Sequence, residues 1–229
     1  LIAQYKEMKA LFALQTAAAQ YVFKTSTGVK DFYDFKDKKF SIGRPGGNGG
    51  RVTKVMLDVH GIDMEKETGG VYMKYVPALE QMANGSMDGA FVFGGLPHAA
   101  IDNASRQMEL SFASPDPAKM EEFQKSITNG EFYVLKHIPA ATIEKAYEGR
   151  VKANGDQYFW AFPFMFVVHE SMSDETAYEL TKTVWDGIDE INKTSLALSL
   201  IKRDVATKGL SVDLHPGAAK YFKEIGVLK

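Results

Sequence analysis

The pattern of hydrophobic and polar positions changes between strand spacing and helix spacing several times along the chain. The clearest change lies between residues 39 and 61, where a short apolar strand enters a loop with five glycines among the eight residues 43–50. Apolar residues then repeat at helical spacing, namely Val52, Val55, Met56 and Val59. The sequence therefore predicts a strand, a glycine loop and a helix, in that order.

The same alternation continues over the rest of the chain. Strands are predicted over residues 20–24, 71–75, 90–93, 108–112, 132–135 and 157–168. Helices are predicted over residues 29–36, 76–83, 98–107, 195–206 and 214–226, between Pro117 and Asn129, and after Ser173, where Ala177, Leu180, Val184, Ile188 and Ile191 line one side. Residues 1–14 are predicted as a helical or irregular lead-in, and residues 138–155 as an exposed connection. This order favours an α/β fold with a parallel or mixed sheet.

The composition excludes several classes of function but does not identify one. The chain has 229 residues, of which 45% are hydrophobic, so it can bury a substantial core in one large domain or two small ones. A net charge of -2 provides no basic footprint for nucleic acid, and the absence of cysteine removes thiol chemistry and disulfides. The densest apolar run, residues 159–168, is shorter than the roughly 18 residues of a membrane span, so the chain is not expected to be membrane-embedded.

The glycine loop is the first candidate binding element. Glycine permits positive φ and close approach to a ligand, and the first turn of the next helix offers unpaired N–H groups, so the loop can cradle a carboxylate or another anion. We predict backbone donation from Gly47, Asn48, Gly49 and Gly50, with charge from Arg44. The loop lacks the Lys-Ser/Thr of a P-loop and the acidic residue of a dinucleotide site. A mobile strand-to-helix turn is the alternative interpretation.

The second candidate element follows the strand at residues 90–93. Phe93 precedes Gly94 and Gly95 at a strand end, where open α/β sheets usually hold ligands, so these three residues are predicted to line the cleft. The aromatic cluster at residues 158–166 is predicted mainly to pack the core and hinge, with Tyr158 or Trp160 as alternative cleft walls.

The chain contains no recognisable catalytic or metal-binding motif. Its histidines show no ligand spacing, it has no Gly-x-Ser-x-Gly elbow, and its carboxylates lie mostly beside lysines, as on a solvated surface. We therefore predict no catalytic residue, no metal and no cofactor. His98 is predicted to be an exposed structural residue and His215 to cap a helix.

Three motifs together resemble the TAXI family of solute-binding proteins that serve TRAP transporters. Residues 35–39 lead into the strand and glycine loop, residues 87–91 lead into a Gly-x-Pro, and residues 215–226 read His-Pro-Gly-Ala-x-x-Tyr-x-x-Glu-x-Gly. The motifs follow the family's order over essentially the whole chain. The family's loop usually reads Gly-Ser-Gly-Thr, whereas residues 46–49 here read Gly-Gly-Asn-Gly, which removes both hydroxyl donors.

The resemblance implies a fold like that of periplasmic binding proteins, with two α/β lobes and mixed sheets. Residues 1–27 would be the remainder of lobe one and its crossing strand, residues 28–155 would be lobe two, and residues 156–229 would return to lobe one. The first part of lobe one has no counterpart in this sequence and is expected to be missing.

The expected function is that of a non-catalytic, periplasmic solute-binding protein whose export signal is not present in this chain. It would capture a small carboxylate or amino acid, glutamate-like or dicarboxylate, for TRAP permease subunits. Two other functions remain open: an enzyme that uses the glycine loop for a phosphorylated or other anionic substrate, and a ligand-sensing protein without a transport role. No nucleic-acid partner is expected.

Overall fold

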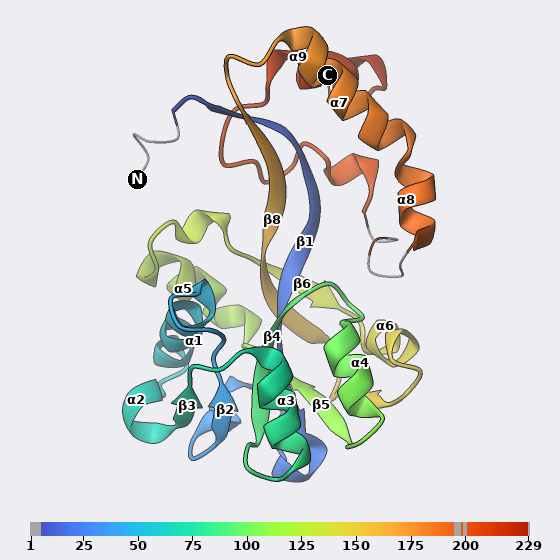
Figure 1. Cartoon of the computed structure of the whole chain (residues 1–229). Coiled ribbons are helices and arrows are strands. Elements are labelled where there is room, and N and C mark those ends of the chain that lie inside the picture. The colour runs from blue at the N-terminus through green and yellow to red at the C-terminus, as the bar shows by residue number, and fades with distance from the viewer. Residues whose placement is uncertain (1–5, 195–197, 199–200, 229) are drawn as a thin grey trace. The chain divides into compact units, whose positions relative to one another are not determined.

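Two units can be distinguished in the computed structural model, which describes residues 6–194, 198 and 201–228. Unit 1 consists of residues 1–17 and 162–229, and unit 2 of residues 18–161. Two long strands, β1 (Met8–Lys24) and β8 (Gln157–His169), each belong partly to both units (Figure 1). The chain therefore passes from one unit to the other twice.

Unit 2 is built around a mixed sheet with the strand order β3-β2-β4-β1-β5-β7, while β8 pairs with β1 and β6. The shorter strands are β2 (Lys39–Ser41), β3 (Gly69–Val71), β4 (Gly89–Gly94), β5 (Leu110–Ala113), β6 (Val134–Ile138) and β7 (Val151–Lys152). β2 runs parallel to β3 and β4, whereas β1 is antiparallel to β4 and β5. The predicted mixed α/β class is confirmed.

Helices follow most of these strands along the chain. They are α1 (Asn48–Val59), α2 (Met64–Glu67), α3 (Tyr75–Ala83), α4 (Ala99–Ser105), α5 (Met120–Ser126) and α6 (Ala140–Ala146). Short 3₁₀ turns lie at Thr25–Thr27, Phe32–Phe35, Pro117–Lys119 and Gly130–Phe132. The predicted order of strand, glycine loop and helix is confirmed, and α3 and β4 lie within one residue of their predicted bounds.

The two faces of the sheet bury different kinds of side chain. Tyr21 and Phe23 of β1 lie opposite Phe91 and Gly89 of β4, and they belong to an aromatic core beside α1. The intervening Val22 points to the opposite face, because side chains alternate along a strand. On that face α3, α4 and α6 cover an aliphatic cluster. Both faces are buried, as expected for strands that read as almost continuous apolar runs.

Unit 1 consists mainly of helices that pack on the ends of β1 and β8. These are α7 (Asp174–Asp186), α8 (Ile188–Thr194) and α9 (Pro216–Glu224), and a 3₁₀ turn lies at Arg203–Val205. Phe12, Trp185 and Phe222 form the centre of its core. His215 caps α9 as predicted, since its Nδ1 accepts a hydrogen bond of 3.2 Å from the Gly217 N–H. Within the described residues, every helix is too short or too polar to cross a membrane.

Two predicted assignments are wrong. The lead-in predicted over residues 1–14 contains the first half of β1, which begins at Met8. The exposed connection predicted over residues 138–155 contains α6 and β7, and Ile143 and Val151 are fully buried. Residues 8–14 form an almost continuous apolar run, which fits a buried strand and a buried helix equally well. In residues 138–155 the apolar residues are separated by polar ones, and tertiary packing decides between a regular element and a loop.

The C-terminal helices also differ from the prediction. Leu180, predicted on the buried side of the long helix, is 45% exposed, and Trp185 is buried instead. That helix ends at Asp186, and Ile188 begins the separate α8. The helix predicted over residues 195–206 is wrong where the structure describes it, since residues 201–206 contain the 3₁₀ turn Arg203–Val205 in place of an α-helix. Residues 195–197, 199 and 200 lie outside the described residues.

His60 joins the end of α1 to the segment before α5. Its buried ring has Nδ1 2.6 Å from the Met56 carbonyl oxygen, while Nε2 accepts a hydrogen bond of 2.9 Å from the Asp116 N–H. A ring that accepts through Nε2 carries its single proton on Nδ1 and is therefore neutral. Burial lowers the pKa of His60, against the opposing effect of the Met56 hydrogen bond.

This geometry predicts a specific loss of stability in mild acid. In the unfolded chain a histidine takes up a proton near pH 6.5, but folded His60 resists protonation, so the free energy of unfolding should fall as the pH drops through about 6.5. In His60→Gln, whose side chain stays neutral, the difference in unfolding free energy between pH 7.5 and pH 5.5 should be smaller. Urea denaturation at both pH values measures this. An identical difference in both proteins would contradict the prediction.

Candidate functional site

The carboxyl ends of three neighbouring parallel strands lie at one edge of the unit 2 sheet. β3, β2 and β4 are adjacent in that order, and β2 is parallel to both neighbours. β2 leads into residues 43–47, β3 into residues 72–74 and β4 into residues 95–98. Ligands of open α/β sheets usually bind at such an edge. Every predicted site residue lies in or beside the loops that follow β2 and β4.

The glycine loop makes a tight turn before α1. Gly46 has φ of +72°, a value that glycine adopts without strain, and the Gly47 N–H donates a hydrogen bond of 3.1 Å to the Arg44 carbonyl oxygen. The Gly47 N–H is thus used within the turn. α1 begins at Asn48, and in the described part of the chain no side chain caps this helix start. Asn48, Gly49 and Gly50 form its first turn, in which Asn48 is exposed while Gly49 and Gly50 are buried, and the N–H groups of such a turn have no partner within the helix.

Gly49 and Gly50 allow close packing of this first turn. A Cβ atom on Gly49 would lie 2.7 Å from Cε1 of Phe91 and 2.8 Å from the Ile42 carbonyl oxygen. A Cβ atom on Gly50 would lie 2.5 Å from Cε1 of Tyr72, a side chain that is 54% exposed. The glycines therefore have a packing role whether or not a ligand binds.

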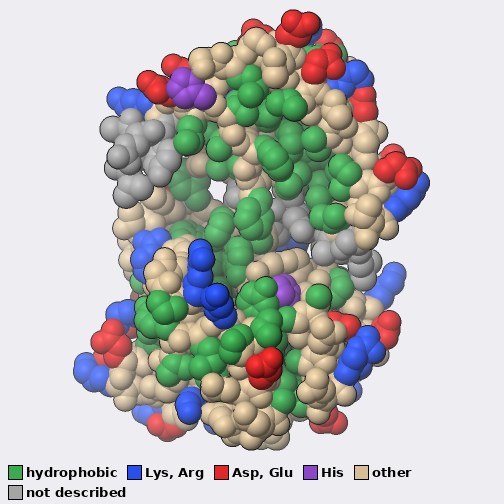
Figure 2. Space-filling view, in the orientation of Figure 1, with side chains coloured by type: hydrophobic (Ala, Val, Ile, Leu, Met, Phe, Trp, Pro, Cys, Tyr) green, Lys and Arg blue, Asp and Glu red, His purple; other side chains and the backbone are tan. Residues whose placement is uncertain are grey.

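Two arginines lie at the start of α1. Arg51 donates to Asn48 Oδ1 from Nε at 3.2 Å and from Nη2 at 3.1 Å, and Nη2 also lies 3.2 Å from the Tyr133 hydroxyl. Arg44 is exposed, and its side chain packs over Gly47. Among the described residues, no carboxylate forms an ion pair with either guanidinium. On the face of unit 2 drawn in Figure 2, basic side chains lie among hydrophobic ones.

The placement of these charges is electrostatically unfavourable in the free protein. The N-terminal end of a helix carries a partial positive charge, and a cation near it is typically unfavourable by about 0.3–1 kcal/mol. The first turn of α1 contains no acidic residue that would compensate. An anion bound here would interact favourably with both guanidinium groups and with the open N–H groups. The sequence prediction missed Arg51, although a basic residue in the first turn of a helix is a readable signal.

An aromatic cluster connects Asn48 to Phe93. Asn48 Nδ2 donates a hydrogen bond of 2.6 Å to the Tyr133 hydroxyl, and the Tyr133 ring centroid lies 5.8 Å from that of Trp160. The Trp160 ring lies 5.4 Å from Phe93, which is partly buried. The structure thus links the two predicted halves of the site through Tyr133 and Trp160. No local signal identifies Tyr133, because it is 85 residues from Asn48 in the sequence.

A second connection reaches the core from the same cluster. Trp160 Nε1 donates a hydrogen bond of 3.1 Å to the Tyr21 hydroxyl, which lies 2.6 Å from Thr53 Oγ1. Thr53 in turn donates to the Gly49 carbonyl oxygen at 2.7 Å. Burial raises the pKa of Tyr21, so its hydroxyl stays protonated. The buried chain of hydrogen bonds fixes α1 and Trp160 relative to the sheet.

Gly94 ends β4 and Gly95 follows it, and a side chain of β1 bonds to both residues. Their carbonyl oxygens accept hydrogen bonds of 3.3 Å and 2.9 Å from Nε2 of the buried Gln20. A Cβ atom on Gly94 would lie 2.6 Å from Cδ2 of His98, so only glycine fits beside this ring. Phe93, Gly94 and Gly95 are therefore close in space as well as in sequence.

His98 is not the exposed residue that the sequence predicted. It is partly buried, and its Nδ1 accepts a hydrogen bond of 3.2 Å from the Ala100 N–H at the start of α4. Burial lowers the pKa of its imidazole, which favours the neutral form that this hydrogen bond needs. In the described ranges, no group of three His, Asp or Glu side chains is placed to hold a metal ion.

Unit 1 contains a pocket of about 580 Å³ with a different electrostatic character. It is lined by charges of both signs, among them Asp186, Arg203 and Lys208. Asp186 pairs with Lys182 and accepts a hydrogen bond of 2.9 Å from the Tyr221 hydroxyl, and Arg203 donates to the Trp185 carbonyl oxygen at 2.8 Å. Because its lining sets the acidic Asp186 and Asp204 against the basic Arg203 and Lys208, the pocket has no excess of positive charge, and the start of α1 is the better candidate for an anion site.

Comparison with known proteins gives a family and several distant structures. The model of the NMT1-like family matches residues 2–226. The substrate-binding protein of an amino acid ABC transporter matches 83% of this chain at 9% identity, with a TM-score of 0.36. The periplasmic aliphatic sulphonate-binding protein SsuA from Escherichia coli matches 89% at 10% identity, with a TM-score of 0.39. A TRAP solute-binding protein from Rhodoferax ferrireducens in complex with benzoate matches 99% at 13% identity, with a TM-score of 0.36.

The chain spans 61% of the amino acid-binding structure, 76% of the sulphonate-binding structure and 56% of the benzoate complex.

The packing at α1 predicts opposite effects for two adjacent glycines. Gly49→Ala should lower the free energy of unfolding by about 1–3 kcal/mol, because its Cβ would collide with the Ile42 backbone as well as with Phe91. Gly50→Ala is the matched control, since the three atoms nearest to its Cβ all belong to the far end of the exposed Tyr72 side chain, which can move away. Because alanine favours a helix over glycine by about 1 kcal/mol, the free energy of unfolding of Gly50→Ala should stay the same or rise. Urea denaturation compares the two. Equal losses in both variants would show that α1 does not pack on β4 as described.

Proposed function

The chain belongs to the NMT1-like family, and we propose that it is a periplasmic solute-binding protein that captures a small carboxylate or amino acid for a TRAP transporter. The resemblance of its motifs to the TAXI family supports the transporter type and the permease partner. A glutamate-like or dicarboxylate solute is the proposed ligand class. In this function the protein binds and releases its ligand without chemical change.

One observation carries the anion preference: Arg44 and Arg51 lie without carboxylate partners, among the described residues, at the open start of α1. Arginine binds a carboxylate through two parallel hydrogen bonds, and such charge-assisted bonds are roughly twice as strong as neutral ones. The helix start adds N–H donors that point in the same direction. Both contributions favour a compact anion over a neutral solute.

The remaining predicted residues are assigned supporting roles. The N–H groups of Asn48, Gly49 and Gly50 would contact the carboxylate, and the Asn48 side chain orients Arg51. Gly47 would shape the turn, since its N–H is already bonded to Arg44. The residues 93–95 at the end of β4 would form the wall that contacts the rest of the ligand.

We assign the lobes in the same proposal. Lobe two would correspond to unit 2, with the predicted residues 28–155 lying inside the observed residues 18–161. Residues 1–27 and 156–229 would supply lobe one and the crossing strands. The two long strands that belong to both units support this arrangement.

The experiment that tests the function is thermal and urea unfolding of this chain with L-glutamate, succinate and inorganic phosphate. A carboxylate present at a hundred times its dissociation constant should raise the free energy of unfolding by about 2.7 kcal/mol, because it binds only the folded protein. Arg44→Ala and Arg51→Ala should each weaken carboxylate binding about 10- to 100-fold, the equivalent of one lost charge-assisted hydrogen bond of about 1.5–3 kcal/mol.

Lys54→Ala is the matched control for this test. Lys54 is a cation on the same helix, but it lies beyond the first turn and pairs with Glu65 at 3.2 Å, so its loss should leave ligand affinity unchanged. Stabilisation by phosphate alone would favour a phosphorylated ligand instead. Unchanged carboxylate affinity in both arginine variants would remove these residues from the site.

A further inference from the structure

Two buried polar side chains lie below the end of β4, on the aliphatic face of the sheet. Gln20 of β1 and Tyr147, the residue after α6, are fully buried, and Tyr147 belongs to the aliphatic cluster there. Burying an amide or a hydroxyl is unfavourable unless each polar atom finds a partner. Their partners therefore indicate what these two side chains hold in place.

Gln20 and Tyr147 bond to each other and to three backbone groups of one segment. Gln20 Nε2 donates to the carbonyl oxygens of Gly94 and Gly95, and its Oε1 lies 3.2 Å from the Tyr147 hydroxyl. The same hydroxyl lies 2.9 Å from the His98 backbone N. Since an N–H can only donate, Tyr147 accepts from His98 and donates to Gln20. This single arrangement satisfies the amide and the hydroxyl together.

The segment between these anchors packs Leu96 into the aliphatic cluster but makes few other hydrogen bonds. Residues 95–98 connect β4 to α4, and Pro97 has no N–H to contribute. In the described part of the chain, the N–H groups of Gly95 and Leu96 make no backbone hydrogen bond outside helices and strands. The hydrogen bonds that anchor both ends of this segment to the sheet therefore come from the Gln20–Tyr147 pair.

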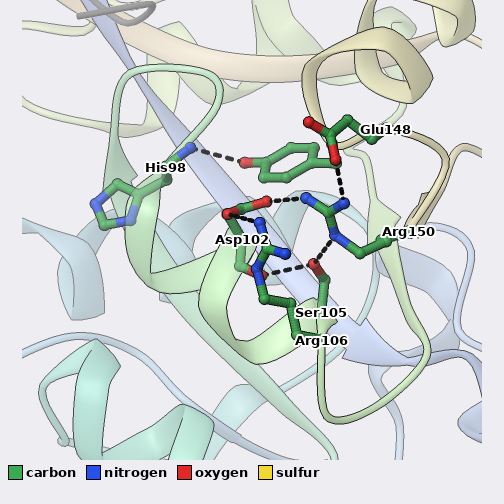
Figure 3. A network of polar contacts seen from close by, with 7 residues as sticks. His98, Asp102, Ser105, Arg106, Glu148 and Arg150 are labelled. Atoms are coloured by element: carbon green, nitrogen blue, oxygen red, sulfur yellow. Dashed lines mark hydrogen bonds and ion pairs between the residues drawn. The ribbon is translucent and has the colours of Figure 1, made fainter.

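An ion-pair network joins the turn after Tyr147 to helix α4. Arg150 pairs with Asp102 and Glu148 and donates to Ser105 Oγ at 3.3 Å, as Figure 3 shows. Its hydrogen bond holds the pKa of Asp102 below the ordinary value, so this carboxylate stays charged. The turn that follows Tyr147 is thereby tied to α4, and the distance from Tyr147 to the start of α4 is constrained.

We propose that Gln20 and Tyr147 are positioning residues that set the Gly94–Gly95 wall for ligand binding. This inference rests on the proposed function, because the wall matters for affinity only if a ligand contacts it. The pair contacts no ligand itself, since both side chains are buried below the segment. Its loss should shift the wall while leaving the arginines at α1 in place.

The first test is amide hydrogen exchange, which needs no ligand. Tyr147→Phe keeps the ring in the core and removes the acceptor of the His98 N–H, so exchange at His98 should become at least 10-fold faster. Ile143→Val, a buried change in the same cluster without a polar contact, is the control. If exchange at His98 is the same in Tyr147→Phe and Ile143→Val, the pair does not hold the segment and the inference is wrong.

The second test is ligand affinity, measured by titration with L-glutamate and with succinate. Tyr147→Phe and Gln20→Met should each weaken binding about 10-fold, and the double variant should be no weaker than either single one, because both act through one segment. Ile143→Val should bind as the parent does. Additive losses, or an equal loss in the control, would overturn the positioning role.

The two proposals fail in different ways. If the parent chain binds no carboxylate, the proposed function fails, and fast exchange at His98 in Tyr147→Phe would still support the holding of the segment. If the parent binds and the arginine variants do not, while the Gln20 and Tyr147 variants bind normally, the site stands and the positioning role falls.

Discussion

The first turn of α1 lies so close to β4 that a hydrogen atom, and no methyl group, fits between Gly49 and the Phe91 ring. This approach determines much of the surrounding structure. It brings Thr53 of α1, whose hydroxyl bonds to the Gly49 carbonyl oxygen within the helix, to the Tyr21 hydroxyl and, through it, to Trp160. The parallel pairing of β2 with β4 provides the frame, because both strands must end at the same edge before the loop can turn back over β4. Glycine in this loop is therefore a requirement of packing first.

That packing has an electrostatic consequence. A helix whose first turn is pressed against the sheet keeps its dipole fixed, and Arg44 and Arg51 add positive charge at its positive end. A protein under selection for stability alone would place an acidic residue there, as α7 does with Asp174 and Glu175. Conflicts between a local rule and the observed residue are concentrated at functional sites. Since α3, α6 and α9 also lack an acidic first turn, the strongest reason to propose an anion at α1 is the pair of arginines at its uncapped start.

The sequence was sufficient to predict elements whose pattern is local. The glycine loop with α1, the strand at β4 and the His215 cap of α9 each depend on neighbouring residues and are confirmed. The first half of β1 and the α6–β7 segment were missed, because their burial comes from partners far away in the chain. The residues of the candidate site likewise divide into those that a local pattern predicts and those that only long-range contacts reveal. Asn48 is readable from the loop, whereas Tyr133, Gln20 and Tyr147 reach the site through contacts that span 49 to 85 residues.

The two sides of the candidate site, the start of α1 and the end of β4, differ in how rigidly they are positioned. This difference suggests how the site would select one anion over another. At α1 the arginines are exposed and charged, so they provide attraction to any small anion and little shape. At Gly94 and Gly95 the proposed wall consists of backbone alone, which has no side-chain freedom with which to adapt. The buried Gln20 amide and Tyr147 hydroxyl next to it can satisfy all of their hydrogen bonds in only one arrangement, because the donor or acceptor role of each atom is fixed by its partners. Discrimination among carboxylates of equal charge would therefore depend on the buried pair more than on the exposed cations.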